Sequence, residues 1–284
     1  MPDTIDPVDN ATGKRFSNGR LDLTFQQDPE GRSYLAEQYF TYPFHVCRAQ
    51  YMDKMLPDLA TLYLQSCSGG IFKGDRLTTR IHGKENARVH VTTQASTIIH
   101  CMEEGSAHQV IEIDGEAGAL IEYLPDCTIL FPEAKLRSSI TVTRHPDCDV
   151  IVGDSFLAHD PDGDGKPFDW FESELVVRRP DGQTDALDRF IVTGEQFDVG
   201  AYSVHGTFAV ITNRAPIGTL LDTFRAQLED SAEVYAGISS LPNNTGCWIR
   251  YLAVDGVAAK RFANALWAIS RESLTGHPPS QRRK

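Results

Sequence analysis

QVIEIDGEAGALIEYLPD, residues 109–126, decides the fold class. Residues 109–113 are rich in β-branched side chains and are followed by an Asp-Gly turn at 114–115. A second run of the same kind, residues 120–124, stops at the Pro-Asp pair 125–126. Such runs, bounded by glycine, proline and aspartate, are typical of β-strands joined by tight turns. This stretch therefore predicts two short strands separated by a turn.

The same pattern repeats outward on both sides, from about residue 40 to residue 213. Further strand-like runs occupy residues 89–93, 139–143, 174–178 and 208–212. Short strands at spacings of this kind predict an all-β sandwich, a barrel or a layered coil of strands. A regular solenoid is not expected, because the sequence has no repeat of fixed period.

Past residue 215 the apolar residues recur at helical spacing. Two amphipathic helices are predicted near residues 216–236 and 256–275, each followed by a glycine, Gly237 and Gly276. A short strand, residues 247–252, lies between them. The predicted fold is mainly β, with layered or helically arranged strands in one body and two C-terminal α-helices. Residues 21–284 are expected to form a single β-rich domain.

Composition excludes several classes of function. The chain has 284 residues and a formal net charge of −12, which argues against a nucleic-acid partner. No apolar run approaches the length that spans a bilayer, so no membrane partner is expected. Residues 1–20 lack an apolar core and are expected to form a disordered leader rather than a signal peptide. Six scattered cysteines, none in a C-x-x-C pair, predict free thiols in a reducing cytoplasm.

A glycine-rich turn is the first candidate for chemistry. The stretch SGGIFKGDRL, residues 68–77, packs three glycines and Asp75 between two strand-like segments, and TTQA follows at residues 92–95. Glycine serves where the backbone needs a positive φ or must approach another group closely. An aspartate beside such glycines either caps the turn or holds a cation, and the sequence leaves both roles open.

A second candidate is a cluster of possible metal ligands. His100, Cys101 and His108 are imidazole and thiolate ligands of the kind that suit nickel, zinc or copper. Adjacent residues of a strand point to opposite faces, so His100 and Cys101 share a site only at a turn. A packed or solvated role for each of these side chains is the plainer alternative.

Two further motifs suggest different functions. Residues 153–157, GDSFL, resemble the nucleophile block of GDSL-type hydrolases, with Ser155 as nucleophile and His159 nearby as a possible base. Residues 160–165, DPDGDG, resemble the opening of a calcium-binding EF-hand loop, but Phe171 occupies the position of its bidentate glutamate. A hydrolase and a divalent-cation-binding module centred on Asp160–Asp164 therefore remain alternatives.

Five blocks in order resemble the family of the urease accessory protein UreD, called UreH in some organisms. They are SCSGGIFKGDR at 66–76, TTQA at 92–95, IEYLPDCTILF at 121–131, IRYLA at 249–253, and LTGHPP at 274–279 with the terminal Arg-Lys. The sequence departs from the family at Ser66-Cys67, where Asn-Pro is usual, and at residues 164–168, which lack a glutamate of the family.

The resemblance implies a non-enzymatic urease maturation factor. Proteins of the family form layered strands with two helices, and they sit between apo-urease and the accessory protein UreF, which holds the GTPase UreG. The implied role is that of a scaffold and metallochaperone that passes nickel(II) in transit, with no tightly bound cofactor. The residues that match the family motif or its ion route are Gly69, Gly70, Gly74, Asp75, Thr93, Gln94 and Glu122.

Overall fold

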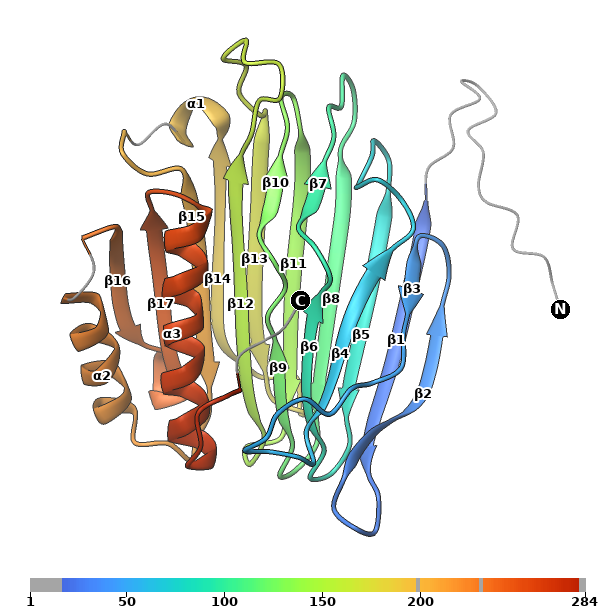
Figure 1. The fold of residues 1–284 in the computed structure, drawn as a ribbon, viewed down its shortest axis with the longest axis vertical. Coiled ribbons are helices and arrows are strands. Elements are labelled where there is room, and N and C mark those ends of the chain that lie inside the picture. Colours follow the sequence, from blue (N-terminus) through green and yellow to red (C-terminus); the bar gives the residue numbers. More distant parts are fainter. Residues whose placement is uncertain (1–16, 198–199, 230–231, 281–284) are drawn as a thin grey trace, which may run out of the picture.

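The computed structural model describes residues 17–197, 200–229 and 232–280, and within them it contains two stacked β-sheets with helices on one side (Figure 1). The seven-stranded sheet has the order β14-β13-β11-β8-β5-β1-β2. Its strands are β1 (Asn18–Gln27), β2 (Ser33–Phe40), β5 (Arg76–Gly83), β8 (Ala107–Gly115), β11 (Lys135–Arg144), β13 (Trp170–Arg178) and β14 (Thr184–Thr193).

The ten-stranded sheet has the order β16-β17-β15-β12-β9-β6-β4-β3, with β10 pairing both β12 and β7. Its strands are β3 (Phe44–Val46), β4 (Ala60–Ser66), β6 (Arg88–Thr93), β7 (Thr97–Ile99), β9 (Leu120–Tyr123), β10 (Thr128–Leu130), β12 (Asp149–Ala158), β15 (Val204–Ile211), β16 (Val234–Ser240) and β17 (Gly246–Ala253). The helices are α1 (Gly194–Phe197), α2 (Ile217–Glu229), α3 (Gly256–Thr275) and the 3₁₀ turn η1 (Pro242–Asn244).

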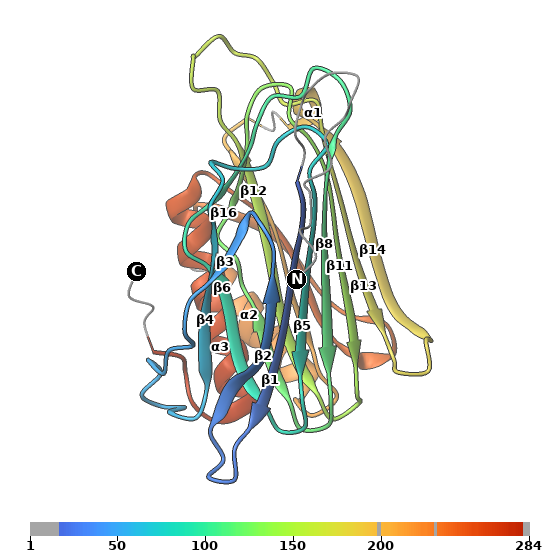
Figure 2. The ribbon, with the colours of Figure 1, turned by 90° about the vertical axis from the view of Figure 1, so that its right-hand side faces the viewer.

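The centre of the molecule is a coil of parallel strands. From β4 to β13 the chain crosses back and forth between the sheets, so that β5, β8, β11 and β13 are parallel neighbours in one sheet. In the other sheet β4, β6, β9 and β12 are parallel neighbours in the same way. On one side of this coil, β14 and β15 are antiparallel to β13 and β12. On the other side, which Figure 2 brings to the front, β1 continues the parallel pairing of β5, and the outermost strands β2 and β3 are antiparallel to their neighbours. The prediction of a mainly β fold with layered, helically arranged strands is confirmed.

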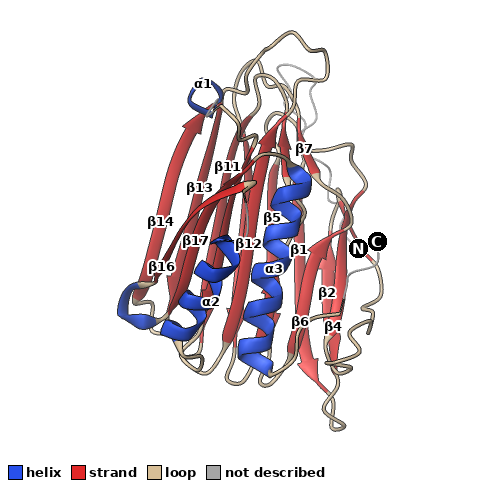
Figure 3. Cartoon of the chain, turned by 60° about the vertical axis from the view of Figure 1, so that its left-hand side comes forward, coloured by secondary structure: helices blue, strands red, loops and turns tan. Residues whose placement is uncertain are grey.

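Three apolar clusters hold these layers together. The largest lies between the sheets and includes Leu23, Leu62 and Val150, and a second inter-sheet cluster near α1 includes Phe156 and Phe171. The third lies between the ten-stranded sheet and helices α2 and α3, which cover that sheet from outside (Figure 3). None of the helices in the described part of the chain has the length and apolar character needed to cross a bilayer.

The helix predicted at 256–275 is confirmed as α3. Asp255 caps its first turn by accepting from the backbone N–H of Ala258, and Gly276 ends it with a φ of 78°. The helix predicted at 216–236 is confirmed over residues 217–229 as α2, but its last residues, 234–236, are wrong because they belong to β16. Strand β17 supplies β16 with a ladder of backbone hydrogen bonds, and Gly237 lies within that ladder instead of ending a helix.

The predicted leader overlaps the fold at its end. Strand β1 begins at Asn18 and pairs with β5 in parallel, so residues 18–20 are part of the seven-stranded sheet. Residues 1–16 of the predicted leader lie outside the described residues.

Candidate functional site

The glycine-rich turn joins the ten-stranded sheet to the seven-stranded sheet, between the end of β4 and the start of β5. Gly70 has a φ of 149°, and a Cβ atom on it would lie 2.4 Å from the carbonyl oxygen of Ile98. Gly74 has a φ of 81°. Larger residues would strain the backbone at both positions, and at Gly70 they would also collide with β7. Gly69 carries no such constraint, since a Cβ there would meet no atom within 4 Å.

Asp75 holds this turn in place. Its buried carboxylate accepts hydrogen bonds from the backbone N–H of Ser17 at 2.8 Å and of Phe72 at 2.9 Å. Each oxygen therefore has a protein donor, which is the arrangement of a turn cap. Of the two roles that the sequence left open, the geometry favours the cap.

Replacing Asp75 by alanine should lower the free energy of unfolding by about 2 kcal/mol, because two buried backbone N–H groups lose their acceptor. Chemical denaturation monitored by circular dichroism measures the change. Asp75→Asn is the matched control. Its amide oxygen can still accept one of the two hydrogen bonds, so this variant should lose less unfolding free energy than the alanine variant. An alanine variant as stable as the parent would show that the cap contributes nothing.

The TTQA block fastens the end of β6 to its neighbours. The Thr92 hydroxyl donates to the carbonyl of Leu124 at 2.6 Å, and the Thr93 hydroxyl accepts from the backbone N–H of Asp126 at 2.8 Å. The backbone N–H of Gln94 donates to the carbonyl of Leu64. These contacts tie β6 to the chain that follows β9 on one side and to β4 on the other.

A band of polar side chains crosses the space between the sheets, separating the two inter-sheet apolar clusters. From the seven-stranded sheet, Gln109, Ser138 and Ser173 lie side by side on adjacent strands. From the ten-stranded sheet, Asp154 and Thr207 face each other in register on β12 and β15. We call this band the polar belt; its members are Thr93, Gln109, Ser138, Asp154, Ser173 and Thr207.

Two cavities open onto the polar belt. The larger, about 230 Å³, lies at the glycine-rich turn; its lining includes Gly70, Thr93, Gln109 and Tyr123, and we call it the glycine-turn cavity. A small cavity of about 10 Å³ lies deeper, between Asp154, Ser173, Thr207 and Asp188. At the far edge of the sheets, Asp188 forms an ion pair with Arg250.

Asp154 is the electrostatic centre of the belt. Burial raises the pKa of its carboxyl to about 6, with only a backbone hydrogen bond from Ser155 acting in the opposite direction. Burial also raises the pKa of the Tyr123 phenol, and the charge of Asp154 raises it further. Among the described residues no arginine, lysine or histidine forms an ion pair with Asp154. A half-buried carboxylate without a counterion is costly, and such groups are concentrated at functional sites.

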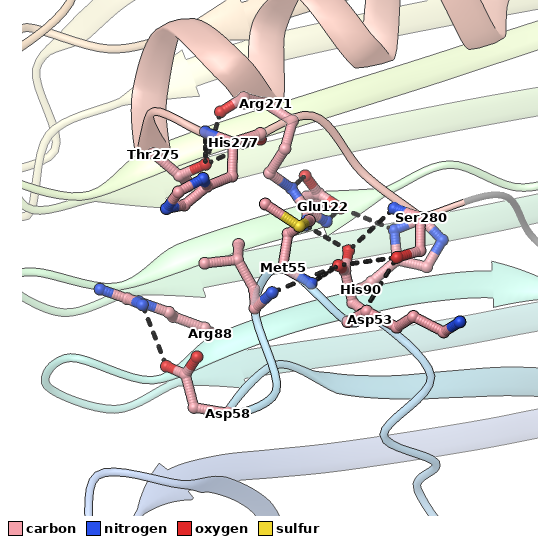
Figure 4. A network of polar contacts seen from close by, with 12 residues as sticks. Asp53, Met55, Asp58, Arg88, His90, Glu122, Arg271, Thr275, His277 and Ser280 are labelled. Carbon is pink, nitrogen blue, oxygen red and sulfur yellow. Dashed lines mark hydrogen bonds and ion pairs between the residues drawn. The ribbon is translucent and has the colours of Figure 1, made fainter.

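Glu122 belongs to a different network, which Figure 4 shows. Its side chain lies on the opposite face of β9 from that of Tyr123. Its fully buried carboxylate accepts from Arg271 Nε at 2.5 Å and from His90 Nδ1 at 2.7 Å. Arg271 Nη1 continues to Asp53 at 2.9 Å, and Asp53 accepts from the Ser280 hydroxyl. Burial alone would raise the pKa of Glu122, but the Arg271 charge and the hydrogen bonds from His90 and Arg271 lower it.

This network joins α3 to the sheet and to the segments around residues 53 and 280. Both oxygens of Glu122 are bound by protein donors, so a cation would have to displace Arg271. The structure therefore places Glu122 apart from the polar belt, in contrast to its expected place on an ion route.

A family model described as UreD urease accessory protein matches residues 17–284. The chain belongs to the UreD family. The urease accessory protein UreD 1 of Pseudomonas syringae pv. syringae B728a is 40% identical over 269 residues, which cover 92% of this chain and 94% of that protein. UreD 1 of Methylorubrum populi is 36% identical over 288 residues, covering 100% of this chain and 96% of that protein. UreD 2 of Bradyrhizobium sp. BTAi1 is 33% identical, with 92% of each chain covered.

Membership confirms the resemblance seen in the five sequence blocks. UreD proteins are urease accessory proteins, so this UreD has a role in urease maturation and is not an enzyme. The alternative of a hydrolase that uses Ser155 is therefore wrong. In this UreD, Ser155 lies in β12 facing a pocket whose described lining contains Cys127 and Tyr251 but no histidine. His159 instead packs its ring against Phe131.

The fold of this chain does not bring the three predicted metal ligands together. His100 stacks on Phe72 with ring centroids 4.3 Å apart, and the Cys101 thiol donates to Glu133 at 2.8 Å. That hydrogen bond, with burial, raises the pKa of Cys101 to about 11, which disfavours the thiolate that binds metals. His108 lies on the outer face of the seven-stranded sheet, between Arg76 and Arg137 in register. Burial and the Arg137 charge lower its pKa.

The loop at Asp160–Asp164 also lacks the geometry of a cation site. The Asp160 carboxylate accepts from the backbone N–H groups of Asp162, Gly165 and Lys166, so it closes its own loop. Within residues 17–197, 200–229 and 232–280, no group of three or more His, Cys, Asp or Glu side chains has the arrangement of a metal site.

Sequence reasoning missed the role of Asp154, which it considered only as part of the GDSL block. A signal was present: on β12 the other inward-facing residues Val150, Val152 and Phe156 are apolar and buried. A charged residue that interrupts the apolar face of a buried strand marks a functional position. The role of Arg271 had no such signal, because its partners lie far away in the sequence.

Proposed function

We propose that this UreD acts in urease maturation as a non-enzymatic scaffold and metallochaperone that helps deliver nickel(II) to the urease active site. In this role it bridges apo-urease and the accessory proteins UreF and UreG, and nickel is its cargo in transit instead of a bound cofactor. The observation that supports the proposal most directly is the polar belt, at whose centre the Asp154 carboxylate forms no ion pair with any residue in the described part of the chain.

The chemistry of the belt suits a cation that must bind weakly and leave again. Its donors are the hydroxyl and amide oxygens of serine, threonine and glutamine, together with one carboxylate, Asp154. Such oxygen ligands hold borderline cations less firmly than thiolate or imidazole groups do. An ion passes along such a path only if each site binds it strongly enough to admit it and weakly enough to release it. Within this proposal Gly69, Gly70, Thr93 and Gln94 shape one cavity of the path.

The remaining residues of the family motif support the path from outside. Gly74 and Asp75 fix the turn beside it, and Glu122 fixes α3 on the sheet. For the scaffold role, the helical face offers an exposed apolar side chain, Val257 at the start of α3. We place UreF on this face. The six cysteines are free, which fits a cytoplasmic location.

Genetic complementation tests the proposal. In a host that expresses urease with its other accessory proteins but no UreD, adding this chain should raise the nickel content of purified urease, and the chain should co-purify with UreF and urease. Metal analysis per active site and affinity pull-down measure the two outcomes. Urease that carries equal nickel with and without the chain would refute delivery, and a chain that binds neither partner would refute the scaffold.

A further inference from the structure

The ten-stranded sheet is interrupted next to Asp154. Strand β9 pairs with β12 only as far as Val152, and β10 resumes the pairing at Phe156. Between these points residues 124–127 leave the ladder, and residues 153–155 of β12 keep ladder partners only on the β15 side. Residues 94–96, between β6 and β7, interrupt the next strand at the same level.

A pocket of about 220 Å³ lies on the helical side of this interruption. Its floor is formed by Gly153, Asp154 and Ser155, and its rim includes Asp126 and Cys127. Helix α3 forms the roof, through residues 256–264. We call this the outer pocket.

The outer pocket shares residues with both cavities of the polar belt. Asp154 and Thr207 line the outer pocket and also the small cavity between the sheets. Ser96 lines the outer pocket and also the glycine-turn cavity. At the interruption of the sheet, the space outside it and the space inside it therefore meet at the same two residues, Asp154 and Thr207.

The two larger spaces differ in charge. The lining of the outer pocket includes two acidic residues, Asp126 and Asp154, and one basic residue, the exposed Lys260 on α3. The described lining of the glycine-turn cavity contains no acidic or basic side chain. A concave site with low-dielectric walls concentrates ions of opposite charge, so a cation is drawn to the outer pocket rather than to the glycine-turn cavity.

We propose that the outer pocket is a lateral mouth through which a hydrated divalent cation enters beneath α3, passes Asp154 at the interruption of the sheet, and leaves through the glycine-turn cavity. This inference rests on the proposed function and gives its route an entrance and a direction. Lys260 stands at the rim and limits entry by repelling cations.

A plug of the mouth provides the first test. Ala263→Trp on α3 places a large ring in the outer pocket, and it should lower nickel loading of urease about tenfold, because the focusing effect of the pocket is lost. Ala265→Trp is the matched control, with the same change on the same helix at a residue that does not line the pocket. Pull-down of UreF and urease by both variants shows whether partner docking is intact.

Charge reversal at the rim provides a second test that needs no change in packing. Lys260→Glu should lower the nickel concentration for half-maximal loading about threefold, since a repulsive charge becomes attractive. Arg261→Glu carries the same change in net charge, but Arg261 pairs with Glu233 and does not line the pocket. It should leave that concentration unchanged.

The outcomes distinguish failure of the lateral mouth from failure of the nickel route on which it rests. The residue Asp154 lies on the proposed route whether or not the cation enters through the outer pocket. If Asp154→Asn leaves the nickel loading of urease unchanged, the proposed route itself is refuted. If Asp154→Asn lowers loading while Ala263→Trp does not, the route stands and the lateral mouth is refuted. Equal effects of Lys260→Glu and Arg261→Glu would also refute the mouth, because net charge alone would then explain both.

Discussion

Replacing Arg271 by methionine should lower the free energy of unfolding of this UreD by about 3–5 kcal/mol, the usual cost of breaking a buried ion pair from one side. The Arg271 side chain is fully buried and contacts both Glu122 and Asp53. Without it, the carboxylate of Glu122 remains in the interior with His90 as its hydrogen-bond partner. Chemical denaturation followed by circular dichroism measures the loss.

A double-mutant cycle separates the pair from the packing of the side chain. Glu122→Gln combined with Arg271→Met should recover part of the loss, because the double variant no longer buries the Glu122 charge. Arg261→Met is the control on the same helix. Its exposed pair with Glu233 should contribute less than about 1 kcal/mol. If the two arginine variants destabilise equally, the buried network has no special role.

The pH dependence of this effect has a definite sign. The pKa of Glu122 is lower in the folded protein than in the unfolded chain, so the network stabilises above the unfolded pKa of a glutamate and this contribution is lost as the pH falls. In Arg271→Met the same carboxyl is buried without the cation, and acid should neutralise it. The stability difference between parent and variant should therefore narrow from neutral pH toward acid.

Asp154→Asn should have two opposite effects, a gain in stability and a loss of function. Burial raises the pKa of the Asp154 carboxyl to about 6, so the folded state holds a proton that the unfolded chain has released between about pH 4 and pH 6. Stability therefore falls as the pH rises through that window and stays low above it. The asparagine amide does not ionise, and the variant should be more stable by about 1–3 kcal/mol at pH 7.

The same substitution should reduce nickel loading of urease about tenfold, because the belt loses the carboxylate that attracts the cation. Unfolding measured at pH 4 and at pH 7 gives the stability effect, which should vanish at the lower pH. Asp162→Asn, in the exposed loop, is the control and should change neither property. An Asp154→Asn variant that is less stable at neutral pH would show that the carboxylate serves the fold instead of the cation.

Much of the fold could be predicted because its signals are local. Residues 109–113 lie in β8, residues 120–123 form β9 and Leu124 directly follows it, and the helix over 256–275 is α3 with its cap and its terminal glycine. Residues 234–236 could not be assigned in this way. Their apolar spacing fits a helix, but Tyr235 lies in an edge strand, since β17 offers hydrogen bonds that no local pattern reveals.

In the candidate site, too, the features set by local sequence could be predicted and those set by tertiary contacts could not. Gly70 and Gly74 could be recognised from the sequence because a positive φ is a property of one residue and its neighbours. His100, Cys101 and His108 were grouped because they are close in sequence, but the coil of strands places His108 on the outer face of the other sheet. Chain neighbours separate wherever the backbone crosses from one sheet to the other.

The sequence by itself determined the mainly β class, the family and the residues of the turns. These depend on the periodicity of side chains, the conformational freedom of glycine and the order of motifs, all of which are local properties of the sequence. Only the tertiary structure decided that Asp154 lies in the polar belt with no counterion among the described residues, and that Arg271 binds Glu122 across 149 positions of sequence. Burial and ion pairing depend on which distant segments meet. Their free energies therefore belong to the folded arrangement and cannot be assigned to any stretch of residues alone.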